Sequence, residues 1–271
     1  MPNYICITCG TQFDDSEELS SHCLICEDQR QFVNWEGQQW TTVEQLTRTH
    51  RNSFKTVENN LIGIGTEPPF ALGQRALLIR TSEGNVLWDC ISLIDDATID
   101  IIQALGGLEA IAVSHPHYFA SMVEWSHAFG NIPIYLHEAN EKWVMRPDPV
   151  IEFWKGETQD MNSEITLIRC GGHFRGGTVL HCKKGAQGRG ALLTGDIIQV
   201  AMDRRHVSFM YSYPNLIPLS EIAVLGIVDS LQPFEFDRIY GAWWGRNILT
   251  DAKSVLAFSA KRYLGAMEKP A

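Results

Sequence analysis

A short apolar run that ends in two histidines, Ala112-Val113-Ser114-His115-Pro116-His117, constrains the fold of this chain most. Apolar runs of this length between turn-forming residues are typical of buried β-strands. The two histidines are spaced i, i+2, so their side chains share a face if the segment is extended, and the proline between them stiffens the backbone. Neutral imidazole is a ligand for zinc, iron and similar metals. We therefore expect a strand end that presents His115 and His117 to one metal ion.

Charge and hydropathy argue against two classes of partner. The 271-residue chain carries a formal net charge of −10, which disfavours nucleic acid and anionic membrane surfaces. No run approaches the ~18 consecutive apolar residues of a transmembrane helix. The first residues lack a basic region followed by an apolar one, so we expect no secretory signal and a cytoplasmic location.

The first thirty residues contain two CxxC units separated by thirteen residues: Cys6 with Cys9, and Cys23 with Cys26. Each unit offers two sulfurs from one tight loop, and four sulfurs complete a tetrahedral zinc site. This spacing resembles that of a zinc ribbon or rubredoxin-like knuckle, so we predict a structural zinc module over residues 1–30. The module carries six acidic residues against one basic residue, which argues against a nucleic-acid finger and favours a structural or protein-contact role.

The remaining chain alternates strand and helix patterns, which predicts an α/β fold. Residues 31–65 read as a connector with one short capped helix near residues 42–46, and residues 66–271 as the main domain. The pattern predicts a hairpin over 76–81 and 86–90, helices over 96–105, 120–129, 137–143, 220–231 and 251–263, and strands over 110–114, 132–136, 164–170, 178–182, 190–196 and 236–240. A long aromatic loop over 199–218 suits a pocket wall.

Two further polar residues stand at strand ends: His173 in a glycine-flanked turn, and Asp196 after an apolar strand. The order of these motifs, together with the hairpin that carries Asp89, resembles the metallo-β-lactamase superfamily over residues 66–271. The resemblance implies a four-layer αββα sandwich with metals at one edge of two facing sheets. It also implies a hydrolase that activates water with a metal.

The chain departs from the family pattern at both places where a second metal would be held. The family motif H-x-H-x-D-H is reduced to His115 and His117, because Phe119 and Ala120 occupy its last two positions. A later family histidine is also absent, since that region reads Gly241-Ala242-Trp243-Trp244. We therefore expect one zinc or iron ion held by His115, His117 and His173, with Asp196 as a fourth ligand or as the catalytic group that orients water.

These features favour a metal-dependent hydrolase of a small-molecule substrate with a reduced, mononuclear site. Substrate-binding candidates are Arg204, Trp243 and Trp244. The alternative is a non-catalytic binding or regulatory protein on a degenerate scaffold, with the zinc module as its protein-contact surface. Mononuclear iron oxygenase chemistry is a third option that a histidine and carboxylate ligand set permits.

Overall fold

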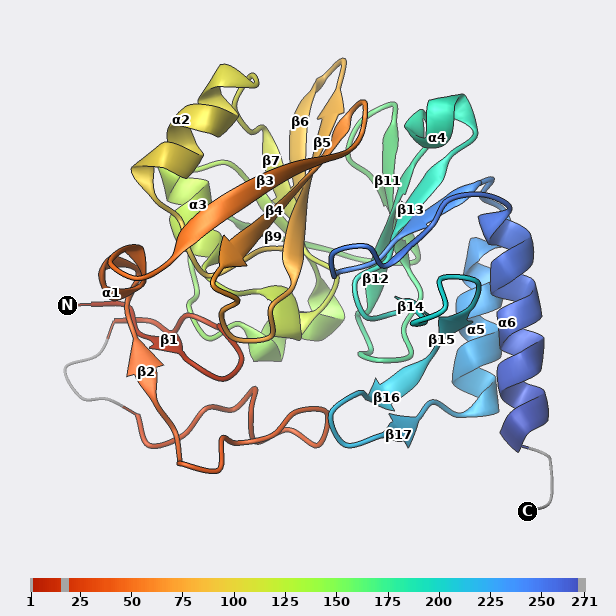
Figure 1. Ribbon diagram of the computed structural model, residues 1–271, viewed down its shortest axis with the longest axis horizontal. Coiled ribbons are helices and arrows are strands. Elements are labelled where there is room, and N and C mark those ends of the chain that lie inside the picture. Colours follow the sequence, from red (N-terminus) through yellow and green to blue (C-terminus); the bar gives the residue numbers. More distant parts are fainter. Residues whose placement is uncertain (1, 16–19, 268–271) are drawn as a thin grey trace. The chain divides into compact units, whose positions relative to one another are not determined.

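The computed structural model describes residues 2–15 and 20–267 of the chain (Figure 1). Residue 1 and residues 16–19 of the predicted zinc module lie outside the described residues. The chain divides into two compact units, Met1–Trp154 and Lys155–Ala271. The predicted boundaries at residues 30 and 65 stay a prediction. Across the described ranges, no helix is both long and apolar enough to cross a membrane.

The first unit is built on a sheet in which seven strands are described, in the order β3-β4-β5-β6-β7-β8-β9. Strands β3 to β6 pair antiparallel as a meander, and β6 to β9 pair parallel. The strand bounds are Arg51–Glu58 (β3), Leu61–Glu67 (β4), Arg75–Thr81 (β5), Gly84–Trp88 (β6), Ala110–Ala112 (β7), Ile134–His137 (β8) and Ile151–Trp154 (β9). The predicted hairpin is confirmed as β5 and β6, whose turn pairs Thr81 with Gly84.

Helices connect the parallel strands, as parallel pairing requires. Helix α2 (Asp96–Ala104) joins β6 to β7, and the 3₁₀ helix η1 (Pro116–Tyr118) with α3 (Met122–Ala128) joins β7 to β8. The helix predicted over 137–143 is a 3₁₀ helix, η2 (Glu138–Trp143). The N-terminal part contains β1 (Ile5–Cys6), which pairs antiparallel with β2 (Trp40–Thr41), and the short helix α1 (Val43–Thr47), capped by Thr42 as predicted.

Helix α2 begins where the sequence predicts, because the Asp95 side chain accepts the Thr98 N–H at 2.8 Å. We expect Asp95→Ala to lower the free energy of unfolding by about 1 kcal/mol, because alanine cannot accept the hydrogen bond from the Thr98 N–H in the first turn of the helix. Urea unfolding followed by circular dichroism measures the change. Asp100→Ala, in the exposed middle of the same helix, is the control and should leave the midpoint nearly unchanged. Equal loss in both variants would contradict the capping role.

The second unit contains a sheet with six described strands in the order β10-β11-β12-β13-β18-β19. All neighbours pair antiparallel except β13 and β18, which are parallel. The strand bounds are Thr158–Asp160 (β10), Ile165–Arg169 (β11), Thr178–Cys182 (β12), Ala191–Leu193 (β13), Arg238–Tyr240 (β18) and Asn247–Ile248 (β19). A short turn of helix, α4 (Gly185–Gly188), lies between β12 and β13.

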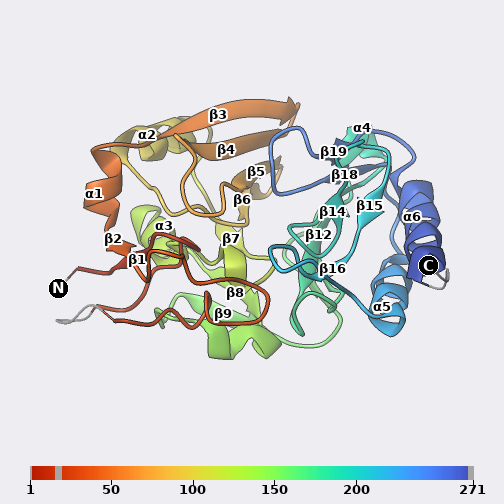
Figure 2. The ribbon, with the colours of Figure 1, turned by 60° about the horizontal axis from the view of Figure 1, so that its bottom comes forward.

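Helices α5 (Glu221–Leu231) and α6 (Ala252–Met267) lie side by side against this sheet (Figures 1 and 2). Their apolar side chains, such as Ile227 and Leu256, pack with strand residues such as Val179, Leu192 and Ile239 in one buried cluster. Ser220 caps α5 as predicted, because its side chain accepts the Ala223 N–H.

The segment over 199–218 is more ordered than the predicted loop. It contains two short antiparallel ladders, β14 (Gln199–Val200) with β15 (Val207–Ser208), and β16 (Met210–Ser212) with β17 (Ile217–Pro218). Phe209 between them is fully buried in the core of the second unit. Phe209 is therefore a core residue, whereas the role of the segment as a pocket wall stays a prediction.

Candidate metal sites

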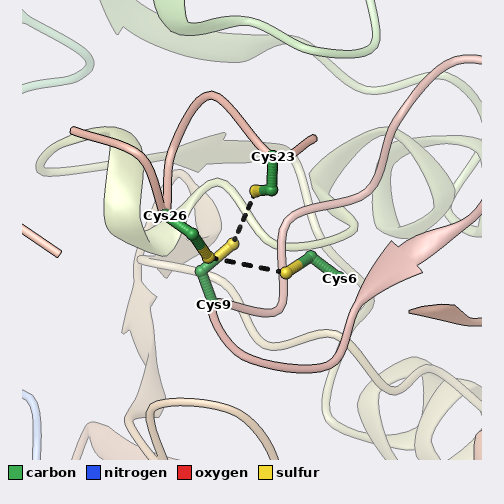
Figure 3. A group of neighbouring side chains, drawn as sticks. All are labelled: Cys6, Cys9, Cys23 and Cys26. Carbon is green, nitrogen blue, oxygen red and sulfur yellow. Dashed lines mark hydrogen bonds between the residues drawn. The ribbon is translucent and has the colours of Figure 1, made fainter. Parts of the chain in front are cut away.

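The four N-terminal cysteines converge on one point, as Figure 3 shows. Their sulfur atoms all lie within 4.8 Å of one another, and the Sγ atoms of Cys6 and Cys26, and those of Cys9 and Cys23, are 3.6 Å apart. A disulfide would need about 2.05 Å. A tetrahedron with Zn–S bonds of ~2.3 Å has edges of ~3.8 Å. The donor set therefore fits one tetrahedral zinc ion, in agreement with the predicted four-cysteine module.

The backbone of each CxxC unit turns back on itself to aim its sulfurs. The N–H of Gly10 donates to the Cys6 carbonyl at 2.8 Å, and the N–H of Glu27 donates to the Cys23 carbonyl at 3.0 Å. Gly10 has a φ of 81°, a left-handed conformation that glycine adopts without steric cost. His22, which adjoins Cys23, is exposed and pairs with Glu27 at 2.6 Å. The four sulfurs thus form the ligand set without it.

The surroundings of the four cysteines suit a thiolate site. The Gln38 side-chain amide donates to the Cys6 sulfur at 3.1 Å. Hydrogen bonds from Cys23, and then from Cys26 and Cys9, lower the pKa of Cys6 far below its ordinary value, whereas burial raises the pKa of Cys9. Apolar side chains cover the cluster: Phe13, Ile25, Trp40, Trp143 and Met145. Ligand thiolates inside an apolar shell are typical of structural metal sites.

The histidine pair of the first unit lies directly after β7. His115 is extended, with φ −168° and ψ 169°, but Pro116–Tyr118 form a 3₁₀ helix in which the Tyr118 N–H donates to the His115 carbonyl. The expectation of an extended segment is therefore wrong beyond His115, because proline suits the first position of a helical turn. The two rings are nonetheless neighbours, with centroids 5.0 Å apart and ligand nitrogens within 4.8 Å.

A hydrogen-bonded chain fixes the ring of His115. Asp89, in a left-handed conformation with φ 58°, accepts the Ser114 N–H at 2.8 Å, and the Ser114 hydroxyl bonds Nδ1 of His115 at 2.8 Å. This bond leaves Nε2 as the ligand atom of the ring. Burial, with a smaller effect from Arg30, lowers the pKa of His115 well below its ordinary value. The ring is therefore neutral at pH 7, which is the form that binds metals.

The second unit carries the other two predicted ligands. His173 is buried in the turn between β11 and β12, and its Nδ1–H donates to the Met210 carbonyl at 2.9 Å. Asp196 is buried in the turn after β13, where the Tyr213 hydroxyl donates to its backbone carbonyl at 3.0 Å. The ligand atoms of His173 and Asp196 lie within 4.8 Å of each other. Each residue is thus held by a partner from the 199–218 segment.

The predicted substrate-binding residues lie in different settings. Arg204 is exposed in a turn with φ 54°, while Trp243 and Trp244 are half-buried in the turn after β18. Their role in substrate binding stays a prediction. Phe119 and Ala120, which follow the histidine pair, are both buried.

Three groups that bond the candidate metal ligands are missed by the sequence analysis: the Ser114 hydroxyl, the Gln38 amide and the Met210 carbonyl. The hydroxyl of Ser114 could have been suspected from its place beside His115. The amide of Gln38 and the carbonyl of Met210 act on Cys6 and His173 across 32 and 37 residues, so only the folded chain brings these pairs together.

The fold is that of the metallo-β-lactamases. The chain is similar to the metallo-β-lactamase DIM-1 exposed to ceftazidime (13% identity, TM-score 0.59, 80% of this chain and 98% of that chain). It is also similar to VMB-1 (14% identity, TM-score 0.58, 80% of this chain and 98% of that chain). A third similar structure is FIM-1 from Pseudomonas aeruginosa in its mono-zinc form (14% identity, TM-score 0.57, 78% of this chain and 95% of that chain). These likenesses confirm the predicted fold class. No protein-family model matches the chain.

One relative has a much more similar sequence than these structures and shows the family. The chain is 49% identical over 269 residues to the uncharacterized protein YmaE of Bacillus subtilis (strain 168), and the match covers 98% of this chain and 97% of YmaE. The chain therefore belongs to the same family as YmaE.

Proposed function

We propose that this protein is a metal-dependent hydrolase whose metal ligands are His115, His117, His173 and Asp196. All four side chains are buried and of types that could hold a metal ion. The observation that carries the proposal is that one nitrogen of each of two histidine rings is already hydrogen-bonded. The Ser114 hydroxyl bonds Nδ1 of His115, and the Met210 carbonyl accepts from Nδ1 of His173. Such outer partners fix the tautomer and orientation of metal-binding histidines.

The residues present fit a single zinc or iron ion. When bound, the ion would supply Lewis acidity and lower the pKa of a water molecule to about 7. The ligand positions that a second ion would need are filled by the apolar side chains of Phe119 and Ala120, which cannot donate an electron pair to a metal. This supports a mononuclear site over the two-metal arrangement.

The chain's own groups have distinct tasks in this proposal. The three imidazoles would hold the ion as neutral ligands, and the charge of the bound ion would favour an anionic or polarised substrate group. The carboxylate of Asp196 is either the fourth ligand or the acceptor that orients the attacking water, as a general base within hydrogen-bond reach would. Burial of these groups excludes bulk water and strengthens each interaction.

Metal counting tests the proposal. We expect about two ions per chain in the wild type, one for each ligand set, and about one in His115→Ala/His173→Ala. His181→Ala is the control, because His181 is a buried histidine of β12 that bonds the Glu235 carbonyl and belongs to neither set. It should retain both ions. A wild type with about one ion, unchanged in the double variant, would overturn the hydrolase proposal and favour the binding or regulatory alternative.

A further inference from the structure

The N-terminal cysteine module is joined to the segment that follows the histidine pair. The backbone N–H of Gln12 donates to the Ala120 carbonyl at 2.9 Å. The Ser92 hydroxyl donates to the Gly10 carbonyl at 2.7 Å, and the Ser121 hydroxyl donates to the Ser92 carbonyl at 2.8 Å. All of these residues are buried. Hydrogen bonds therefore run from the residues next to Cys9 to the start of α3.

Side chains reinforce this joint. Nη1 of Arg146 donates to Gln12 Oε1 at 2.6 Å and to Glu124 Oε1 at 2.7 Å, and the Gln12 amide donates to the same Glu124 oxygen at 3.3 Å. Glu124 lies in α3. Arg146 and Glu124 are mostly shielded from solvent, with 13% and 32% of their side chains exposed. Charge-assisted bonds of this kind are stronger than neutral ones.

Gly10 makes the approach between the two segments possible. A Cβ atom added at Gly10 would lie 2.6 Å from the Ser92 hydroxyl oxygen and 3.1 Å from the Ala71 Cβ. Real Cβ atoms essentially never come within 3.0 Å of another heavy atom, so a larger residue would push the Ser92 hydroxyl away, and its contact with Ala71 would also be tight. The same displacement would strain the bond between Ser92 and Ser121.

The joined segment is in turn rigidly connected to the histidines. The Tyr118 N–H donates to the His115 carbonyl, and the Phe119 N–H donates to the Pro116 carbonyl. The Tyr118 ring packs edge-on against the His115 ring, with centroids 4.5 Å apart. Only one short helical turn therefore separates His115 and His117 from Ala120, and a shift at Ala120 has little room to be absorbed.

We propose that Gly10 and Gln12 are positioning residues for His115 and His117, so that the metal-organised cysteine module sets the placement of the two rings. The part that these rings play in catalysis rests on the proposed function, but the coupling itself does not. The module is then a component of the histidine site and not only an appended contact surface.

The test compares Gly10→Ala with Gly37→Ala. Both glycines have left-handed φ angles, 81° and 88°, but a Cβ at Gly37 meets no atom within 4 Å. The two variants share the conformational cost of replacing glycine and differ in the close contact with Ser92. The ring resonances of His115 and His117 are read by NMR in protein labelled with ¹⁵N-histidine, with His181 of the second unit as an internal reference. Hydrogen exchange over 118–122 is measured on the same samples.

We expect Gly10→Ala to shift both ring resonances and to speed exchange over 118–122 at least about tenfold, while Gly37→Ala matches the wild type. If Gly10→Ala does not fold, Ser92→Ala alone, which lies outside both ligand sets, should still shift the rings. Unmoved rings in these variants, or equal shifts in Gly10→Ala and Gly37→Ala, would overturn the proposal.

This readout separates the two proposals. Metal counting that finds no ion at the histidines would defeat the proposed function and leave the ring shifts intact. Unmoved rings in a protein with two ions would defeat the positioning role alone.

Discussion

Cys9→Ser/Cys23→Ser should lose about one zinc ion per chain and with it the folded structure of the cysteine module. The change removes one sulfur from each CxxC unit, so neither unit can hold the ion alone. Structural zinc contributes ~10–16 kcal/mol to small zinc-finger peptides, as much as or more than the stability of a whole domain. A segment of this length cannot replace that contribution by burying apolar surface.

Metal analysis and limited proteolysis check this result, with new cleavage expected near residues 20–40. Cys182→Ser is the matched control, because Cys182 is a buried cysteine in β12 of the second unit and lies outside the four-cysteine cluster. It should retain the zinc and resist the protease. Wild-type zinc content in the double variant would show that the four sulfurs do not hold the ion.

Hydrolysis of an ester, lactone and phosphodiester panel should fall more than about a hundredfold in kcat/KM when His117 is replaced by alanine. Removal of an outer-shell partner typically costs about 10–100-fold in metal affinity or activity, and removal of a ligand itself costs more. Ser114→Ala, which leaves the His115 ring in place but removes the 2.8 Å bond to its Nδ1, should therefore show the smaller loss of ~10–100-fold.

The order of these effects distinguishes a metal centre from general damage to the fold. His181→Ala should hydrolyse the panel at the wild-type rate, since the described hydrogen bond of its ring goes to a backbone carbonyl within the second unit. Activity that survives His117→Ala would place the reaction elsewhere on the molecule. A wild type that hydrolyses nothing on the panel would favour the binding or regulatory alternative.

Local signals explain which parts of this structure are predictable. The Asp95 cap, the hairpin turn and the CxxC spacing each depend on residues a few positions apart, and all three are confirmed. The sequence pattern misses the 3₁₀ turn after His115, because alternation assumes an extended chain, whereas Pro116 begins a helical turn. It also does not show that Phe209 is a core residue, because an aromatic residue in such a segment has the same sequence pattern whether it is buried or lines a pocket.

The sequence predicts the candidate ligands of the site but not the groups that bond them. Candidate ligand residues at strand ends can be proposed from hydropathy and spacing, which is how His115 and His173 are predicted. Their outer partners cannot, because the Met210 carbonyl has no side-chain identity to detect and Gln38 is an ordinary polar residue in a connector.

The bond from Gln12 to Ala120 also limits how this protein could change over evolution. The cavity beside Ala120, bordered by Thr11, Gln12 and Arg146, measures only about 10 Å³. A histidine ring there would need the N-terminal segment to move. A larger side chain at position 120 would thus require coordinated substitutions more than a hundred residues apart in the chain. Point mutations at 119 and 120 alone would meet an occupied space, because the segment after the first CxxC unit packs there.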